Sequence, residues 1–201
     1  MSTLAEQYLD AIRRGNLGLS ARLEDELDAE GRAADARLNA PHALLNAAVY
    51  YARRGVAVFP CRPRGKEPIT AHGLKDATTD VDRVLAWWQA TPDANIGAPT
   101  GLTFDVVDID GREGVLAVYG TADDGKRPID DVQEIGHSLT ARMAGHHVFI
   151  EPTGRGNTAK MLPGVDYRGR GGYVILPPSV GANGNRYRWT RPLEVLKAAA
   201  A

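Results

Sequence analysis

Hydrophobic and polar positions recur along the chain with two different periods. Apolar residues three and four positions apart lie on one face of a helix, so such stretches between capping and stop residues predict helices. The expected helices cover residues 3–38, with a break at 15–16, and residues 43–54, 81–89 and 113–119. Short apolar or alternating runs between Gly, Pro and Asn residues predict strands instead. The expected strands cover residues 56–60, 95–101, 104–111, 135–141, 146–150, 186–189, and one strand made of 165–167 and 172–176 with a break at 168–171. Because the short strands crowd the C-terminal part, this order predicts a mixed α+β fold in which an N-terminal α/β unit packs on a mostly antiparallel sheet.

The first forty residues differ from the rest in charge and in apolar content. They carry five Arg against eight Asp or Glu residues, and the apolar face of their second expected helix consists of Leu23, Leu27 and Leu38. A helix with so thin an apolar face gains little from burial, so we expect this segment to dock loosely at most and to be accessory. The sequence therefore predicts three regions, namely a helical extension (1–40), a main domain (41–192) and a tail or truncated linker (193–201).

One stretch in the middle of the chain, Phe104–Gly111, combines a buried strand with two acidic residues. Asp108 and Asp110 are two positions apart, so on a strand they project from the same face. Two neighbouring carboxylates repel each other and resist burial unless a cation or a proton relieves them. Mg²⁺ is often held by one or two carboxylates together with substrate phosphates, so the pair is a candidate metal site. The alternative is a strand that ends in a turn, with both carboxylates solvated beside Gly111.

Later strands and one loop add further candidates. His147 begins an apolar strand, Asp166 lies on another and precedes Arg168, and Lys66 lies on a rigid basic loop. With Asp166 the carboxylates number three, enough for two metal ions that clamp the attacking and leaving oxygens of a phosphoryl displacement. A His assisted by Lys or Arg neutralises and orients a triphosphate. Each residue also has a structural alternative, and His146 faces the other side of its strand, which favours a structural or exposed role.

Composition limits the possible classes of protein. The chain has 201 residues, 43% hydrophobic and 24% charged, with a net charge of −1, which is ordinary for a globular protein. The segment 137–191, however, holds eight basic residues against two acidic ones, a local excess that suits a polyanionic partner. Cys61 is the only cysteine, which excludes an intrachain disulfide and a cysteine-based zinc cluster and fits a reducing cytoplasm. No apolar run approaches membrane-spanning length, so we expect no contact with a membrane.

The candidate residues occur in an order that resembles a known family. Asp108-Ile109-Asp110, then Gly145-His146-His147, then Val165-Asp166 resemble the three motifs of the archaeo-eukaryotic primase superfamily. Over residues 43–190 the chain is similar to the bifunctional primase–polymerase domain of plasmid and phage replication proteins. It departs from that pattern at Ala144-Gly145, where a Gly pair often precedes the histidine.

The resemblance implies a fold, an activity and a set of partners. It implies an RRM-like catalytic sheet that adds dNTPs or NTPs on a single-stranded DNA template with Mg²⁺ or Mn²⁺, next to a helicase domain downstream in the full-length protein. Asp108, Asp110 and Asp166 would be catalytic metal ligands. His147 would be catalytic and contact the triphosphate, and Arg168 and Lys66 would bind the nucleotide.

Two other classes of protein share part of this pattern. Val-Val-Asp-Ile-Asp-Gly also fits the first motif of haloacid-dehalogenase-type phosphatases, with Asp108 as nucleophile and Asp110 as acid or base. That fold needs a parallel sheet and a later Gly-Asp-x-x-x-Asp stretch, which the sequence lacks. A non-catalytic RRM-like module could bind nucleic acid through residues such as Tyr173 and Trp189, but it leaves three placed carboxylates unexplained.

Overall fold

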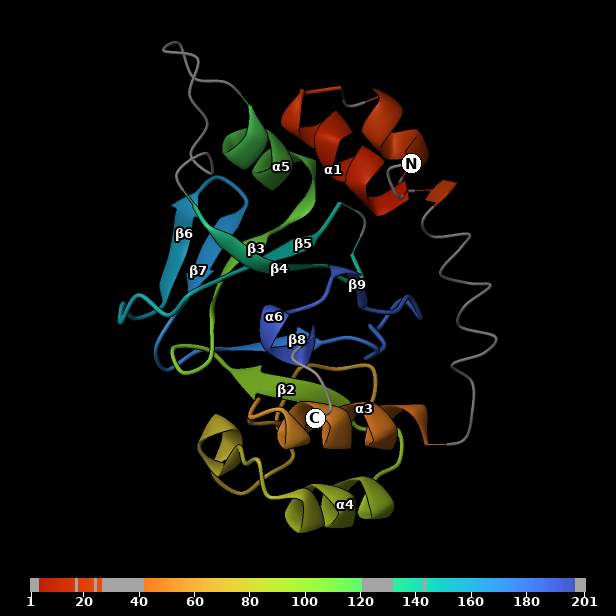
Figure 1. Cartoon of the computed structure of the whole chain (residues 1–201), viewed down its shortest axis with the longest axis vertical. Helices are drawn as coiled ribbons and strands as arrows, with labels where there is room; N and C mark the ends of the chain where they lie inside the picture. Colours follow the sequence, from red (N-terminus) through yellow and green to blue (C-terminus); the bar gives the residue numbers. More distant parts are fainter. Residues whose placement is uncertain are drawn as a thin grey trace.

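The computed structural model describes residues 4–26, 42–120 and 132–197, apart from positions 17, 24 and 143. The helices are α1 (Leu4–Arg13), α3 (Ala43–Arg53), the 3-10 helix η1 (Gly73–Asp76), α4 (Val81–Ala90), α5 (Gly111–Tyr119) and α6 (Glu194–Lys197) (Figure 1). The strands are β1 (Phe59–Cys61), β2 (Asn95–Pro99), β3 (Asp105–Ile109), β4 (Glu134–Leu139), β5 (His146–Ile150), β6 (Thr158–Leu162), β7 (Val165–Arg168), β8 (Tyr173–Leu176) and β9 (Arg188–Arg191). This is the mixed α+β fold that the sequence predicts.

Two sheets organise the described residues. The larger has the order β6-β7-β3-β5-β4-β9, and the smaller has the order β1-β2-β8. Every pair of neighbouring named strands is antiparallel, as predicted, and β3 lies in the interior of the larger sheet. No helix in the described part of the chain is both long and apolar enough to cross a membrane.

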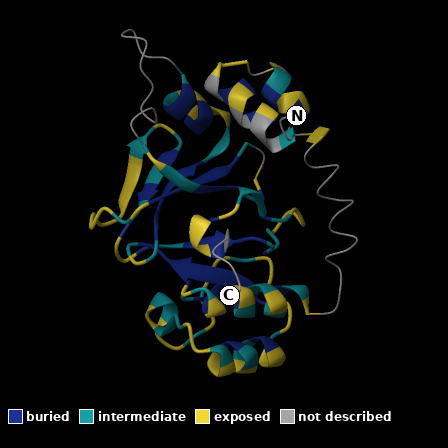
Figure 2. Cartoon of the chain, viewed as in Figure 1, coloured by how far each residue is buried: buried dark blue, intermediate teal, exposed yellow. Residues whose placement is uncertain are grey.

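The two faces of the larger sheet pack against different layers. Val107, Ile109 and Val148 form a core with α1 and α5, whereas Val106 and Phe149 face α3, α4 and the smaller sheet. Since side chains alternate along a strand, one face is covered by the first group and the opposite face by the second. In Figure 1, α1 and α5 accordingly lie on one side of the larger sheet, and β2, α3 and α4 on the other. Figure 2 shows buried strands between helices with exposed outer sides.

One predicted strand is wrong. The stretches 165–167 and 172–176 were expected to form a single interrupted strand, but β7 belongs to the larger sheet and β8 to the smaller one. Gly171 has φ +87, a backbone conformation that glycine adopts without strain. The glycine-rich segment 168–171 therefore does more than interrupt a strand, because it carries the chain from one sheet to the other.

The described part of the N-terminal extension packs more tightly than its sequence indicates. Tyr8 and Ile12 are only 1% and 2% exposed, and Leu23 is buried as well. The Tyr8 hydroxyl lies 2.9 Å from Nε2 of His146, and the two rings stack. The apolar face that docks is thus supplied mainly by α1. Leu27, Leu38 and the expected boundary at residue 40 lie outside the described residues.

Candidate functional site

Strand register brings three of the candidate residues into one row. Asp108 on β3 is paired directly with His147 on β5 and with Asp166 on β7. Directly opposed residues of antiparallel strands project from the same face, with side chains close enough to interact. The row lies on the face that is turned toward the smaller sheet, because Val106 and Phe149, two positions away, pack there.

Nitrogen-bearing side chains surround the carboxylates of this row. His147 Nε2 lies 3.4 Å from Asp108 Oδ1, and Arg168 Nη2 lies 3.2 Å from Asp108 Oδ2 and 2.7 Å from Asp166 Oδ2. Arg168 follows Asp166 by two positions on β7, which puts both on the same face. The backbone N–H of Lys160 donates to the other oxygen of Asp166 at 2.7 Å. A single guanidinium therefore bridges the two carboxylates.

These neighbours keep Asp108 ionised. Burial alone would raise the pKa of the Asp108 carboxyl, but the hydrogen bond from His147 and the charges of His147, Arg168 and Lys66 outweigh burial and hold that pKa well below its usual range. Burial and the nearby Asp108 charge also raise the pKa of Tyr187 to about 12, so this phenol stays neutral. The site thus places the negative charge of Asp108 near the positive charges of Arg168 and Lys66.

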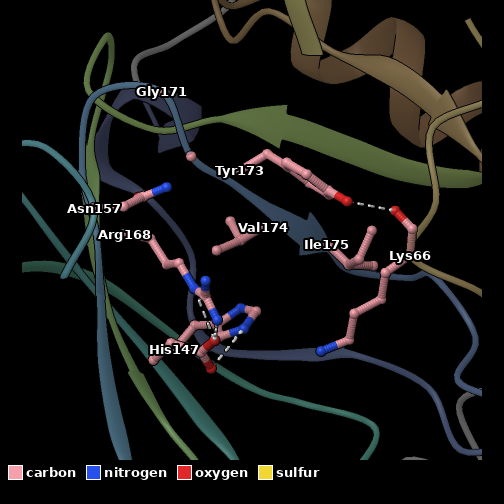
Figure 3. Close-up of a pocket in the computed structure, with 10 residues that line it drawn as sticks. Lys66, His147, Asn157, Arg168, Gly171, Tyr173, Val174 and Ile175 are labelled. Carbon is pink, nitrogen blue, oxygen red and sulfur yellow. Dashed lines mark hydrogen bonds and ion pairs between the residues drawn. The ribbon is translucent and has the colours of Figure 1, made fainter. Parts of the chain in front are cut away.

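A pocket of about 200 Å³ opens above Asp108 and His147. Arg168 and Asn157 line one side, Lys66 lines another, and β8 contributes Tyr173, Val174 and Ile175. In Figure 3 the side chains of Arg168 and Lys66 reach toward His147 from opposite sides. The Tyr173 hydroxyl donates to the Lys66 carbonyl at 3.1 Å and so fastens the Lys66 loop to β8. The pocket therefore lies between the two sheets.

Asp110 is not among the residues that line the pocket. It precedes α5, its side chain is 42% exposed, and its carboxylate pairs with Arg142 Nη1 at 3.3 Å. Its backbone N–H donates to the carbonyl of Gly164. The structure thus gathers Lys66, Asp108, His147 and Arg168 in the pocket, places Asp166 beside them, and leaves Asp110 near the end of β3 with its own cation.

Sequence reasoning did not identify Asn157 as part of the site. Its side-chain Oδ1 accepts a hydrogen bond from the Gly169 N–H at 3.0 Å, so it connects two loops at the pocket wall. Asn157 stands in a polar loop without periodicity, and no local signal distinguishes it from a solvated residue. The glycines at 169, 171 and 172 do mark the opposing loop, but they do not reveal which residue packs against it.

The carboxylates of the site could supply part of the ligand set of a divalent cation. No group of three or more His, Cys, Asp or Glu side chains is placed to hold a metal ion within the residues that the structure describes. Asp108 and Asp166 nevertheless converge on one positive group, the guanidinium of Arg168. Mg²⁺ is commonly held by one or two carboxylates with the rest of its shell from water and substrate phosphates. Two converging carboxylates are therefore a sufficient protein contribution.

One known protein family matches most of the chain. The model of the family described as bifunctional DNA primase/polymerase, N-terminal, matches residues 48–200. The match includes every residue that lines the pocket and begins after α1. None of the curated proteins compared with the chain matches it.

Proposed function

The chain belongs to the bifunctional DNA primase/polymerase family, and we propose that the pocket between its sheets is the site of template-directed nucleotidyl transfer. The family indicates a primase or polymerase that acts on a DNA template and nucleotides. The observation that carries the assignment to this pocket is the row Asp166–Asp108–His147, which faces Arg168 and Lys66. Carboxylates beside a set of cations suit a substrate that is a metal-bound triphosphate.

In this proposal the carboxylates hold metal and the cations hold phosphate. Asp108 and Asp166 would hold Mg²⁺ or Mn²⁺, and Asp110, which pairs with Arg142 in this structure, would be a third ligand. When bound, two such ions stabilise the attacking and leaving oxygens of an in-line displacement. His147, Arg168 and Lys66 bind the triphosphate oxygens, and the low pKa of the Asp108 carboxyl keeps it available as a ligand at neutral pH.

The cellular setting is proposed from the family resemblance alone. We propose a role in the replication of a plasmid or phage in the cytoplasm, with a single-stranded DNA template and a helicase domain downstream in the full-length protein.

The rival classes differ in what they require of the sheet. A haloacid-dehalogenase-type phosphatase requires a parallel doubly wound sheet, whereas the pairs of named strands here are antiparallel. A module that only binds nucleic acid has no use for Asp108, because a buried carboxylate repels phosphate unless a cation lies between them.

A primer-extension assay with and without metal tests the proposal. We expect extension of a labelled primer on a single-stranded template with Mg²⁺ or Mn²⁺ and none in EDTA. Asp108→Asn keeps the shape of the side chain but removes its charge, so we expect a loss of at least about 100-fold in rate. Asp93→Asn, at an exposed position, is the matched control.

Three results would contradict the assignment. Extension by Asp108→Asn at the control rate would remove Asp108 from the site. Binding of the strand without extension under any metal would favour the non-catalytic module. Phosphate release from a simple ester without template would favour the phosphatase.

A further inference from the structure

A rim of three loops stands beside the pocket, and we propose that a single nucleic-acid strand lies across it on the way to the site. The rim is defined as residues 100–104, 153–157 and 169–172. Figure 3 shows that Asn157, Arg168 and Gly171 approach the pocket from one side, where two of these loops meet β7. The inference rests on the proposed function and adds to it the location and chemistry of the strand-binding surface.

Hydrogen bonds tie the three loops into one surface. The Thr100 hydroxyl donates to the Gly169 carbonyl at 2.6 Å, and the Thr100 N–H donates to the Gly172 carbonyl at 3.0 Å. The Arg170 N–H donates to the Arg155 carbonyl at 2.7 Å. The middle loop is also anchored from below, since the Thr153 N–H donates to the buried Asp105 carboxylate at 2.7 Å. The rim is thus held by polar contacts between distant segments.

The packing of the rim leaves no room for larger residues at the contact points. Gly101 has φ +84, and a Cβ at this position would overlap the backbone of Arg170. A Cβ on Gly172 would overlap the Asn157 side chain. Such close approaches restrict the loops, so the side chains on the rim start from fixed backbone positions.

Exposed positive charge is the main chemical feature of the rim. Arg155 and Arg170 are both exposed, and neither forms an ion pair with a residue in the described ranges. Arg168 differs in this respect, because it forms ion pairs with both carboxylates of the site. The Arg155 guanidinium lies 5.0 Å from the centre of the Tyr167 ring, which restrains it. Neither Arg155 nor Arg170 lines the pocket. The ligand that suits them is therefore a chain of phosphates that extends beyond the nucleotide bound in the pocket.

An exposed apolar side chain accompanies this charge. Leu102 is 67% exposed, the highest value among the large hydrophobic residues that the structure describes as exposed, and it follows Gly101, which packs on Arg170. An apolar group on the same rim as two guanidinium groups can contact the face of a base while the cations contact phosphates of the strand. Only an unstacked strand offers base faces in this way. The combination therefore favours a single strand over a duplex.

Fluorescence anisotropy tests whether the rim binds the strand. The full chain is titrated into a fluorescein-labelled single strand of about 20 nucleotides at several salt concentrations. The test variant is Arg155→Gln with Arg170→Gln. The matched control is Arg22→Gln with Arg53→Gln, which removes two exposed charges that do not line the pocket. Each phosphate contact on a single strand releases about 0.7 counterions, so the slope of log K against log salt is negative, and we expect it to become less steep by about 1.4 in the test variant only. We also expect its affinity to fall at least about fivefold at low salt.

Leu102 distinguishes base contact from phosphate contact. We expect Leu102→Ser to weaken binding and Leu102→Trp to tighten it, both with an unchanged salt slope, because no phosphate contact changes. A changed slope in either variant, or no change in affinity in both, would overturn the base contact.

The experiments distinguish rejection of the rim as the strand-binding surface from rejection of the proposed function. If the wild type extends primers and binds the strand, but the test variant binds as the control does, the rim is not the strand surface. The same conclusion follows if only triphosphate affinity falls, or if a duplex of equal length competes as well as the single strand. If the wild type neither binds the strand nor extends a primer, the proposed function itself is rejected and the rim with it.

Discussion

Asp108 carries the charge on which the candidate site depends. It is buried between β5 and β7, and it contacts His147 on one side and Arg168 on the other. A buried carboxylate is tolerated only when it is paired, and Arg168 supplies that pairing to Asp108 and Asp166 together. A ligand that brings its own cation and phosphates can therefore exchange partners with Arg168 without leaving a buried charge unpaired.

The two adjacent histidines should separate nucleotide binding from folding. His147 contacts Asp108, whereas His146 points to the opposite face and contacts Tyr8. We expect His147→Ala to raise the KM for triphosphate by about tenfold or more, since it removes a charge-assisted contact, with little change in strand affinity. The control is His146→Asn, which should lower the melting temperature and leave KM almost unchanged. Nucleotide titrations of both variants check this, and a larger KM effect from His146→Asn would mean that the facing of β5 is misassigned.

His146 should also make the folded state sensitive to acid. Burial, and to a lesser extent the charge of His147, lowers the pKa of His146 to about 3, while the unfolded chain titrates near the ordinary value of 6.5. Below pH 6.5, His146 is therefore protonated in the unfolded state but stays neutral in the folded state. The free energy of unfolding consequently falls as the pH falls toward 3. The fall is up to about 1.4 kcal/mol for each pH unit.

The non-titrating variant His146→Asn measures this contribution. Between pH 6.5 and 5 we expect the free energy of unfolding of the wild type to fall by about 2 kcal/mol more than that of the variant. Urea denaturation at the two pH values gives both numbers. Equal falls in the two proteins would show that His146 does not remain neutral in the folded state.

At the scale of elements, α1 completes the core on one face of the larger sheet. Tyr8 and Ile12 are almost fully buried against strands and α5. Full burial of a large apolar side chain contributes about 1.5–3 kcal/mol, and loss of a partner for buried His146 adds about 1–3 kcal/mol. The packing of α1 thus contradicts the weak docking that its charged sequence suggests.

Removal of the N-terminal segment should destabilise the protein. For a chain that begins at residue 42 we expect a loss of roughly 5 kcal/mol, which corresponds to a fall of about 10 °C or more in Tm. Tyr8→Phe, which removes the hydroxyl and keeps the ring, should cost about 1 kcal/mol. Calorimetry of the truncated and full chains checks this, and an unchanged Tm would show that the contacts of α1 contribute nothing.

Local patterns identified most elements but not their partners. Helices α3, α4 and α5 and strands β3 and β5 follow their apolar periodicity closely. Strand β6 was missed because three of its five residues are exposed, so no alternation marks it. Whether 165–176 forms one strand or two depends on contacts with β2 and β3, which lie far away in the sequence.

The site shows the same division between local and distant information. Asp108 and His147 could be predicted because charged or polar residues inside apolar strands are locally unusual. The pairing of Asp110 with Arg142 could not, since it arises from a contact across 32 residues. The bridging role of Arg168 likewise depends on the pairing of β7 with β3.

For the whole molecule, the crossing from β7 to β8 fixes the two sheets relative to each other. The chain passes from Arg168 on the larger sheet to Tyr173 on the smaller one within a few residues. Gly172 lies in this crossing, against the side chains of Thr100 and Asn157.

Gly172→Ala should therefore loosen the connection between the sheets. The added methyl group would displace Asn157 and Thr100, whose side chains hydrogen-bond to Gly169, so we expect a loss of about 1–3 kcal/mol. Gly18→Ala is the matched control, because it lies in a helical stretch with nothing within 4 Å and should be neutral or stabilising. Thermal denaturation compares them, and equal Tm values would show that the crossing accommodates the methyl group.

The cross-strand row of Asp166, Asp108 and His147 has a consequence for refolding. A slip of one residue between β3 and its neighbours would keep most backbone hydrogen bonds but send Asp108 to the opposite face. Molecules with slipped and correct pairing would have similar far-ultraviolet circular dichroism. Only correctly paired molecules would contribute to the specific activity after refolding. The ratio of specific activity to the circular dichroism signal therefore measures the fraction of molecules in which β3 has the correct register.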